Sequence, residues 1–130
     1  KSEVGLKNGR ELLSEIEFQV AKRLSKVDEQ KLYIQLLIDV IVRNGAIKEK
    51  YRNNYQEIIN NTADLFANAF EIENNECKKG VASILVAAID GIAIQQALDV
   101  LPEDLEKIIG IFTSFFSESI PIYLKKHLEQ

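Results

Sequence analysis

The sequence has no methionine and no tryptophan, and it contains one cysteine, one histidine and two prolines among 130 residues. A single cysteine excludes a disulfide within the chain and fits a reducing compartment. Nucleophilic catalysis by serine or cysteine needs a nearby base, and the one histidine, His127, stands close to the end of the sequence. Zinc sites need several cysteine or histidine ligands. We therefore expect no enzyme, no bound metal and no cofactor.

Charge and hydropathy narrow the class of protein further. The net charge is -4 and both signs are interspersed, which argues against nucleic-acid binding by this segment itself. The longest apolar runs, residues 36–42 and 83–94, are shorter than the ~20 residues that span a bilayer, and each contains an aspartate. These observations predict a soluble, cytoplasmic protein that does not bind a membrane.

Glycine and proline are scarce and alternation of the β type is weak, so the pattern predicts helices. The predicted helices cover about residues 7–26, 28–44, 55–71, 78–99 and 102–120, with a short polar helix or turn at 46–54 and a loop at 73–80. Asp28 is the expected N-cap of the second helix and Gly45 its end. That helix is apolar on most sides, which predicts a central position. Pro121 should kink or end the last helix. We predict one all-α domain of five to six helices.

The helix over 78–99 combines a bulky face with a stripe of small residues. At about 100° per residue, one side carries Gly80, Ser83, Ala87 and Gly91, and the opposite side carries Val81, Leu85, Ala88 and Ile92. A stripe of small residues lets another helix approach closely. The last helix also has surplus apolar surface, so we expect a homodimer through residues 81–120. The expected interface residues are Ser83, Ala87, Asp90, Gly91, Ile94, Phe112 and Phe116. The alternative is that both helices are simply central in the core.

The segment "ILVAAIDGIAIQQALD" at 84–99, followed by "LPEDLEKII" and a long aromatic helix, resembles the C-terminal regulatory domain of TetR-type bacterial transcriptional repressors. The resemblance implies that the last two helices form a four-helix bundle with a second subunit. It also implies a pocket for a small apolar effector in the preceding helices. The N-terminal helix-turn-helix module of that family has no counterpart here. Because the chain opens on Lys1 rather than methionine, we expect a piece of a longer protein, with DNA contacted only through the absent module.

Aromatic residues on apolar helix faces are candidates for lining such a pocket. Ligand pockets are mostly apolar with a few converging polar groups. The candidate ligand-binding residues are Tyr33, Tyr55, Phe66, Phe70 and Gln95, and Asn68 and Asp39 are further polar candidates. The alternative is that the aromatic residues form ordinary core, and Asp39 has the further alternative of facing water.

Asp90 has two interpretations, because a buried charge must be paired or it costs several kcal/mol. It lies at the dimer seam and pairs with a polar group of the partner, or it points into the pocket. In the first case Gly91 permits close helix approach, at a cost in helix propensity of roughly 1 kcal/mol relative to alanine. The function predicted is ligand sensing and dimerisation in a TetR-type repressor. The alternative is an all-helical protein-interaction module without a small-molecule ligand.

Overall fold

The computed structural model describes residues 2–43, 45–70 and 77–127. Within these ranges the chain forms five α-helices and no strand, which confirms the all-α prediction. The helices are α1 (Ser2–Leu24), α2 (Val27–Val42), α3 (Ala46–Ala69), α4 (Cys77–Ala97) and α5 (Leu105–Lys126).

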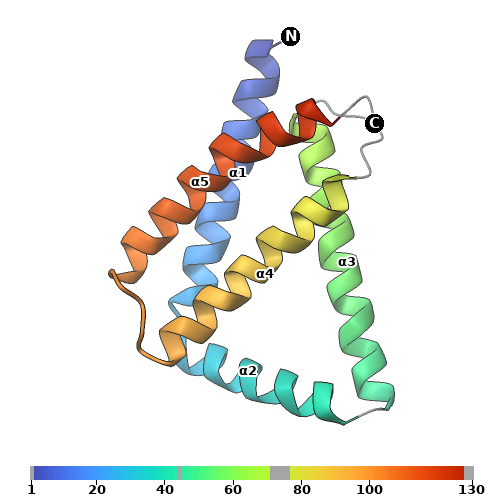
Figure 1. Ribbon diagram of the computed structural model, residues 1–130, viewed down its shortest axis with the longest axis vertical. Helices are drawn as coiled ribbons and strands as arrows, with labels where there is room; N and C mark the ends of the chain where they lie inside the picture. Colours follow the sequence, from blue (N-terminus) through green and yellow to red (C-terminus); the bar gives the residue numbers. More distant parts are fainter. Residues whose placement is uncertain (1, 44, 71–76, 128–130) are drawn as a thin grey trace.

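The helices are arranged around a triangle (Figure 1). In that view α2 forms the base, α3 rises from its end, and α4 returns diagonally to the other end of α2. α4 packs against α2, α3 and α5, whereas α1 packs chiefly against α5 and α3. α4 therefore has α5 as one neighbour and α2 and α3 as the others.

The hydrophobic core lies among four of the helices. α1, α3, α4 and α5 each contribute buried apolar side chains to it, and Leu24, Phe66, Ile120 and Leu124 are the largest that are fully buried. On α4 the bulky side predicted from the sequence supplies Leu85, together with the neighbouring Ala82 and Ala93. In α2 the only residue buried to this degree is polar, Gln30. α2 thus closes one side of the fold without entering its centre.

The prediction that α2 is central is wrong. Its apolar side chains remain substantially exposed, at 58% for Leu32, 56% for Ile38 and 76% for Val42. An apolar composition is equally compatible with a helix covered by its own chain and with one that is not, so the pattern alone could not distinguish them. α2 packs on α4 along its inner side and leaves its outer side uncovered.

The predicted helix ends near residues 28 and 45 also need correction. The N-cap of α2 is Lys26, and Asp28 lies in the first turn. There its negative charge interacts favourably with the positive end of the helix dipole. Gly45 is the N-cap of α3 and has a φ of 154°, a backbone region that glycine enters without strain. The segment 46–54 is the beginning of α3 and no separate element.

α5 also begins later and continues further than predicted. Asp104, and not Pro102, starts it as N-cap, with a side-chain oxygen that accepts a hydrogen bond from the Lys107 amide at 2.9 Å. The helix continues through Pro121 to Lys126, although proline removes one backbone hydrogen bond. Ile120 and Leu124 are buried on either side of this position, so packing holds both halves in place.

The connection from α4 to α5 turns at Asp99. This residue has a φ of 60°, and the amides of Leu98, Asp99 and Val100 bond to the last carbonyls of α4. Aspartate is one of the few residues other than glycine that adopts this left-handed conformation readily. The turn sends the chain from α4 into α5.

α4 is the one helix of the described residues that is long and apolar enough to cross a membrane. The apolar run 83–94 is only part of this helix, and the expectation that the chain does not span a membrane stays a prediction. A single such helix is weak evidence of a membrane span, because core helices of other proteins meet the same criteria. α4 packs against three other helices of this fold.

Candidate functional site

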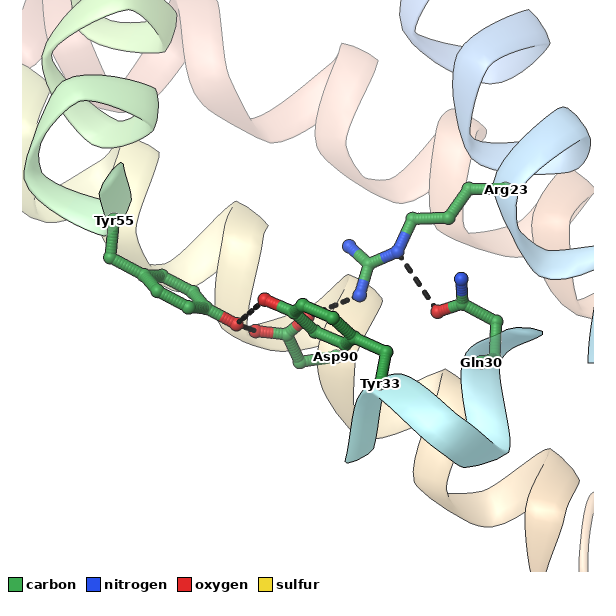
Figure 2. A network of polar contacts seen from close by, with 5 residues as sticks. All are labelled: Arg23, Gln30, Tyr33, Tyr55 and Asp90. Carbon is green, nitrogen blue, oxygen red and sulfur yellow. Dashed lines mark hydrogen bonds and ion pairs between the residues drawn. The ribbon is translucent and has the colours of Figure 1, made fainter. Parts of the chain in front are cut away.

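Five polar side chains meet between α1, α2, α3 and α4, and we call them the Asp90 cluster: Arg23, Gln30, Tyr33, Tyr55 and Asp90 (Figure 2). Arg23 Nη2 lies 2.7 Å from Asp90 Oδ1, and Tyr55 donates its hydroxyl proton to Asp90 Oδ2 at 2.9 Å. Tyr33 donates to the hydroxyl of Tyr55 at 2.9 Å, and Arg23 Nε donates to Gln30 Oε1 at 3.0 Å. One connected network therefore joins four helices.

The cluster satisfies the charge of Asp90 within its own chain. The Asp90 side chain is 24% exposed and that of Arg23 is 33% exposed, so both are largely withdrawn from water. The Arg23 guanidinium also lies over the ring of Tyr33, 5.6 Å from its centroid, where the face of the ring attracts a cation. Both partners that the structure gives for the carboxylate belong to the same chain, Arg23 on α1 and Tyr55 on α3.

The hydroxyl of Tyr55 is held in its protonated form. Burial raises the pKa of Tyr55 well above its usual range, and the hydrogen bond from Tyr33 and the nearby charge of Asp90 act in the same direction. A phenolate here would face the Asp90 carboxylate at close range. Tyr55 therefore remains a hydrogen-bond donor at any physiological pH.

This shift predicts a loss of stability in alkali. Below about pH 10 the phenol is protonated in both the folded and the unfolded chain, so it contributes no pH dependence. Above about pH 10 the unfolded chain releases the proton while the folded chain retains it, so the free energy of unfolding falls as pH rises. Urea unfolding at about pH 9 and about pH 11 measures this fall, which should be smaller in Tyr55→Phe than in the wild type.

Tyr51→Phe is the control, because it removes a phenol from the same helix outside the cluster. It should keep the full alkaline loss. Equal losses in Tyr55→Phe and the wild type would contradict the buried, hydrogen-bonded state of Tyr55.

A cavity of about 260 Å³ opens beside the cluster. Arg23, Tyr33 and Tyr55 form its polar end. The rest of its wall is mainly aliphatic and comes from α1, α3 and α4: Ile16, Val20, Ile58, Leu65, Leu85, Val86 and Ile89. Such a mainly apolar cavity with a few converging polar groups is typical of small-molecule sites.

The candidate ligand-binding residues from the sequence separate into two groups. Tyr33 and Tyr55 line this cavity. Phe66 is fully buried and Phe70 is nearly so, and both belong to the hydrophobic core, which is the alternative considered for them from the sequence. Gln95 and Asn68 are exposed. Asp39 is also exposed, and it pairs with Arg43 at 3.3 Å.

The candidate dimer residues lie at several depths. Ser83 and Ala87 are exposed, Ile94 is 44% exposed and Gly91 is half-buried. Phe112 is buried in the core of its own chain, and Phe116 is half-buried. Phe116 borders a second, apolar cavity of about 440 Å³ between the beginning of α4 and the end of α5.

Uncovered apolar side chains on the last two helices define what we call the α4–α5 face: Ile84, Ile94, Ile111, Phe115 and Ile122. On α4 the small residues Ser83, Ala87 and Gly91 share the helical side of Ile84 and Ile94. A Cβ added at Gly91 would meet no atom within 4 Å. Among the described residues, Ser83 and Ala87 on the small stripe are exposed, and the space beside Gly91 is open.

Sequence reasoning missed Arg23. Arg23 follows Lys22 in a helix of mixed charge and reads as part of a solvated face. One signal was present: an aspartate in an apolar helix needs a cation, and Arg23 stands between the apolar residues Val20 and Leu24 at the border of the buried side. On α5, Phe112 is buried and Phe115 is exposed. Both are phenylalanines in the same apolar helix, so the sequence pattern does not distinguish them.

The interactions that this site offers are hydrogen bonds and apolar contacts. Among residues 2–43, 45–70 and 77–127, no three His, Cys, Asp or Glu side chains gather in a way that could hold a metal ion. The polar groups of the cluster are bonded to one another and leave an open apolar space beside them. Comparisons with protein families, with curated proteins and with solved structures found no match to this chain.

Proposed function

We propose that this chain is the ligand-sensing and dimerisation domain of a TetR-type transcriptional repressor. As proposed, it is a cytoplasmic sensor rather than an enzyme, it pairs with a second copy of itself, and it binds a small, largely apolar effector. Its influence on DNA would pass through a helix-turn-helix module that lies outside these residues. The resemblance, which is sharpest over residues 81–116, motivates the proposal.

The observation that carries the proposal is the position of the 260 Å³ cavity. Its wall includes residues of α1, which would continue toward the DNA-reading module, and of α4, which would meet the second subunit. A ligand there touches both helices at once. Differential binding to two arrangements of α1 and α4 is what a ligand needs in order to shift a population between them. The spacing of two DNA-reading heads would then change with ligand.

The α4–α5 face supports the dimer. Five large apolar side chains are exposed there, and contiguous apolar surface of this kind commonly marks an interaction site. A self-complementary pairing of two helices per subunit would cover both helices in each copy. Gly91 would then allow close approach of the two copies of α4.

The proposal predicts a homodimer that a charge on this face disrupts. Light scattering at micromolar concentration should give about twice the chain mass of 14.7 kDa. Ile94→Glu should give the monomer mass, because it places a carboxylate in the covered surface. Ile38→Glu is the matched control: Ile38 is an exposed isoleucine on α2, away from the face, so this variant should remain dimeric.

Gly91→Ala distinguishes the interface from a solvent-exposed stripe. In an isolated chain this substitution should stabilise α4 by roughly 1 kcal/mol through helix propensity, because nothing opposes the added methyl group. In a dimer with closely packed α4 helices it should weaken association. A monomeric wild type, together with a stabilised Gly91→Ala, would refute the dimer and with it the family assignment.

One observation favours a second candidate, a protein-interaction module without a small-molecule ligand. The outer side of α2 carries exposed Leu32, Leu36 and Ile38, on a helix that does not belong to the α4–α5 face. A partner helix laid along α2 would cover these residues. The two candidates differ in the cavity, because only the first requires it to bind a ligand.

A further inference from the structure

The polar end of the 260 Å³ cavity carries no net charge. Arg23 and Asp90 cancel each other across a distance of 2.7 Å, and Tyr33 and Tyr55 contribute neutral hydroxyl groups. An ion that enters the cavity meets Arg23 in the wall, and the charge of Arg23 is already paired with Asp90, which lies outside the lining. It therefore gains little from either charge, while the aliphatic wall gives no replacement for its lost hydration.

Glu15, a charged residue of the cavity wall, does not make the cavity more favourable for an anion. Glu15 lines the cavity opening, is exposed, and accepts a hydrogen bond from Gln19 at 2.9 Å. Gln19 and Thr62, the other polar residues of the wall outside the cluster, are also bonded, and Thr62 donates to the Ile58 carbonyl. Water screens the charge of the exposed Glu15, so it stabilises a bound cation only weakly.

The cluster retains hydrogen-bonding capacity at one place. Tyr33 donates its proton to Tyr55, which leaves the lone pairs of its own oxygen as acceptors. The Arg23 guanidinium has five N–H groups, and its bonds to Gln30 and Asp90 use Nε and Nη2. A hydroxyl group beside them can donate to Tyr33 and accept from Arg23. The remainder of the cavity wall is mainly aliphatic and suits an apolar body.

The volume limits the size of that body. A water molecule occupies about 30 Å³ in the liquid, so about 260 Å³ holds on the order of ten non-hydrogen atoms. A single ring with a short alkyl chain fills this space, whereas a molecule of three or more fused rings exceeds it.

We infer that the effector is an uncharged molecule of about ten non-hydrogen atoms with one hydroxyl-type head group, of the alkylphenol or medium-chain alcohol class, and that its head binds between Tyr33 and Arg23. This inference rests on the proposed ligand-sensing function and specifies the chemistry of its site. The neutral cluster selects against charge, and the one-sided placement of the polar groups orients the molecule.

Four probes of matched shape test the inference: 4-propylphenol, propylbenzene, 4-propylbenzoate and 4-propylbenzylammonium. Isothermal titration calorimetry of the wild-type chain at about pH 7 measures their affinities; a phenol, with a pKa of about 10, is uncharged there. We expect 4-propylphenol to bind about fivefold or more tightly than propylbenzene, the gain from one neutral hydrogen bond. The two ions should bind at least about tenfold more weakly than the phenol.

Two variants locate the binding. Tyr33→Phe should reduce the affinity for 4-propylphenol about fivefold and leave that for propylbenzene unchanged, because it removes only the hydroxyl group. Tyr51→Phe, on α3 outside the cavity, should change neither. Unchanged phenol binding in Tyr33→Phe would overturn the inference and would point to another location, such as the apolar cavity beside Phe116.

The remaining outcomes separate this inference from the function on which it rests. Tightest binding by the benzoate or the ammonium probe, abolished by changes in the cluster, would overturn the neutral class and leave ligand sensing in place. No heat of binding and no shift in melting temperature with any of the four probes would overturn both. In that case the exposed side of α2 and the interaction-module candidate would account better for the protein.

Discussion

Replacing Phe66 with alanine is expected to lower the free energy of unfolding by about 3–5 kcal/mol. The side chain is fully buried in the core, 6.3 Å from the ring of Phe70, and the described residues that line the two cavities do not include it. Truncation therefore leaves a void among packed neighbours, which adds to the lost transfer free energy. Urea unfolding followed by circular dichroism measures the change.

Phe18→Ala is the matched control, a phenylalanine in the helix α1 that is 60% exposed. It should change the free energy of unfolding by no more than about 0.5 kcal/mol, as surface substitutions usually do. A small loss in Phe66→Ala, comparable with that of Phe18→Ala, would show that the Phe66 ring faces a void. Phe66 would then regain the place in the ligand pocket that the sequence suggested for it.

A double-mutant cycle on Arg23 and Asp90 should give the second large effect. Arg23→Met keeps the length of the side chain but removes the cation from a carboxylate that is only 24% exposed. We expect a loss of about 1–3 kcal/mol, the range for hydrogen bonds to charged groups. The loss of stability in Asp90→Asn should be smaller, because the amide oxygen still accepts a hydrogen bond from the Tyr55 hydroxyl group. The coupling energy should be about 1–2 kcal/mol and should persist in salt, since both side chains are largely withdrawn from water.

The exposed pair of Arg43 and Asp39 provides the comparison for this cycle. Its side chains are 79% and 54% exposed, and the same substitutions there should show a coupling of about 0.3–0.5 kcal/mol that salt removes. A coupling between Arg23 and Asp90 no larger than this would mean that the Asp90 cluster is a solvated surface pair, and it would remove the neutral polar end from the cavity.

Helix identity was predictable in this chain because local chemistry determines it. The small and bulky sides of α4, and the acidic start of α5 before a long aromatic run, are each present within about twenty residues of sequence. The helix ends were less predictable. Asp28 and Asp104 are equally good N-cap candidates by composition, yet only Asp104 is the cap, because Lys26 takes that position in α2.

Burial and pairing were not predictable, because they depend on elements distant in the sequence. Asp90 and Arg23 are 67 residues apart, and no local pattern couples them. The apolar side chains of α2 indicated a central helix, yet the core closes among the other four helices and leaves them uncovered. Asp90 was expected to pair with the second subunit or to point into the pocket, and the structure pairs it with Arg23 and Tyr55 of its own chain. The sequence could not say which residues these partners are.

The hydrogen bond from Tyr55 to Asp90 has an optical consequence. The chain contains four tyrosines and no tryptophan, so its ultraviolet emission comes from tyrosine alone, and two of those rings line the cavity. A carboxylate that accepts a hydrogen bond from a phenol quenches tyrosine fluorescence. Tyr55 should therefore emit weakly while it donates to Asp90. A molecule that enters and draws Tyr33 or Tyr55 out of this network should brighten the protein. Unlabelled protein in a fluorimeter would thus report the occupancy of its own cavity.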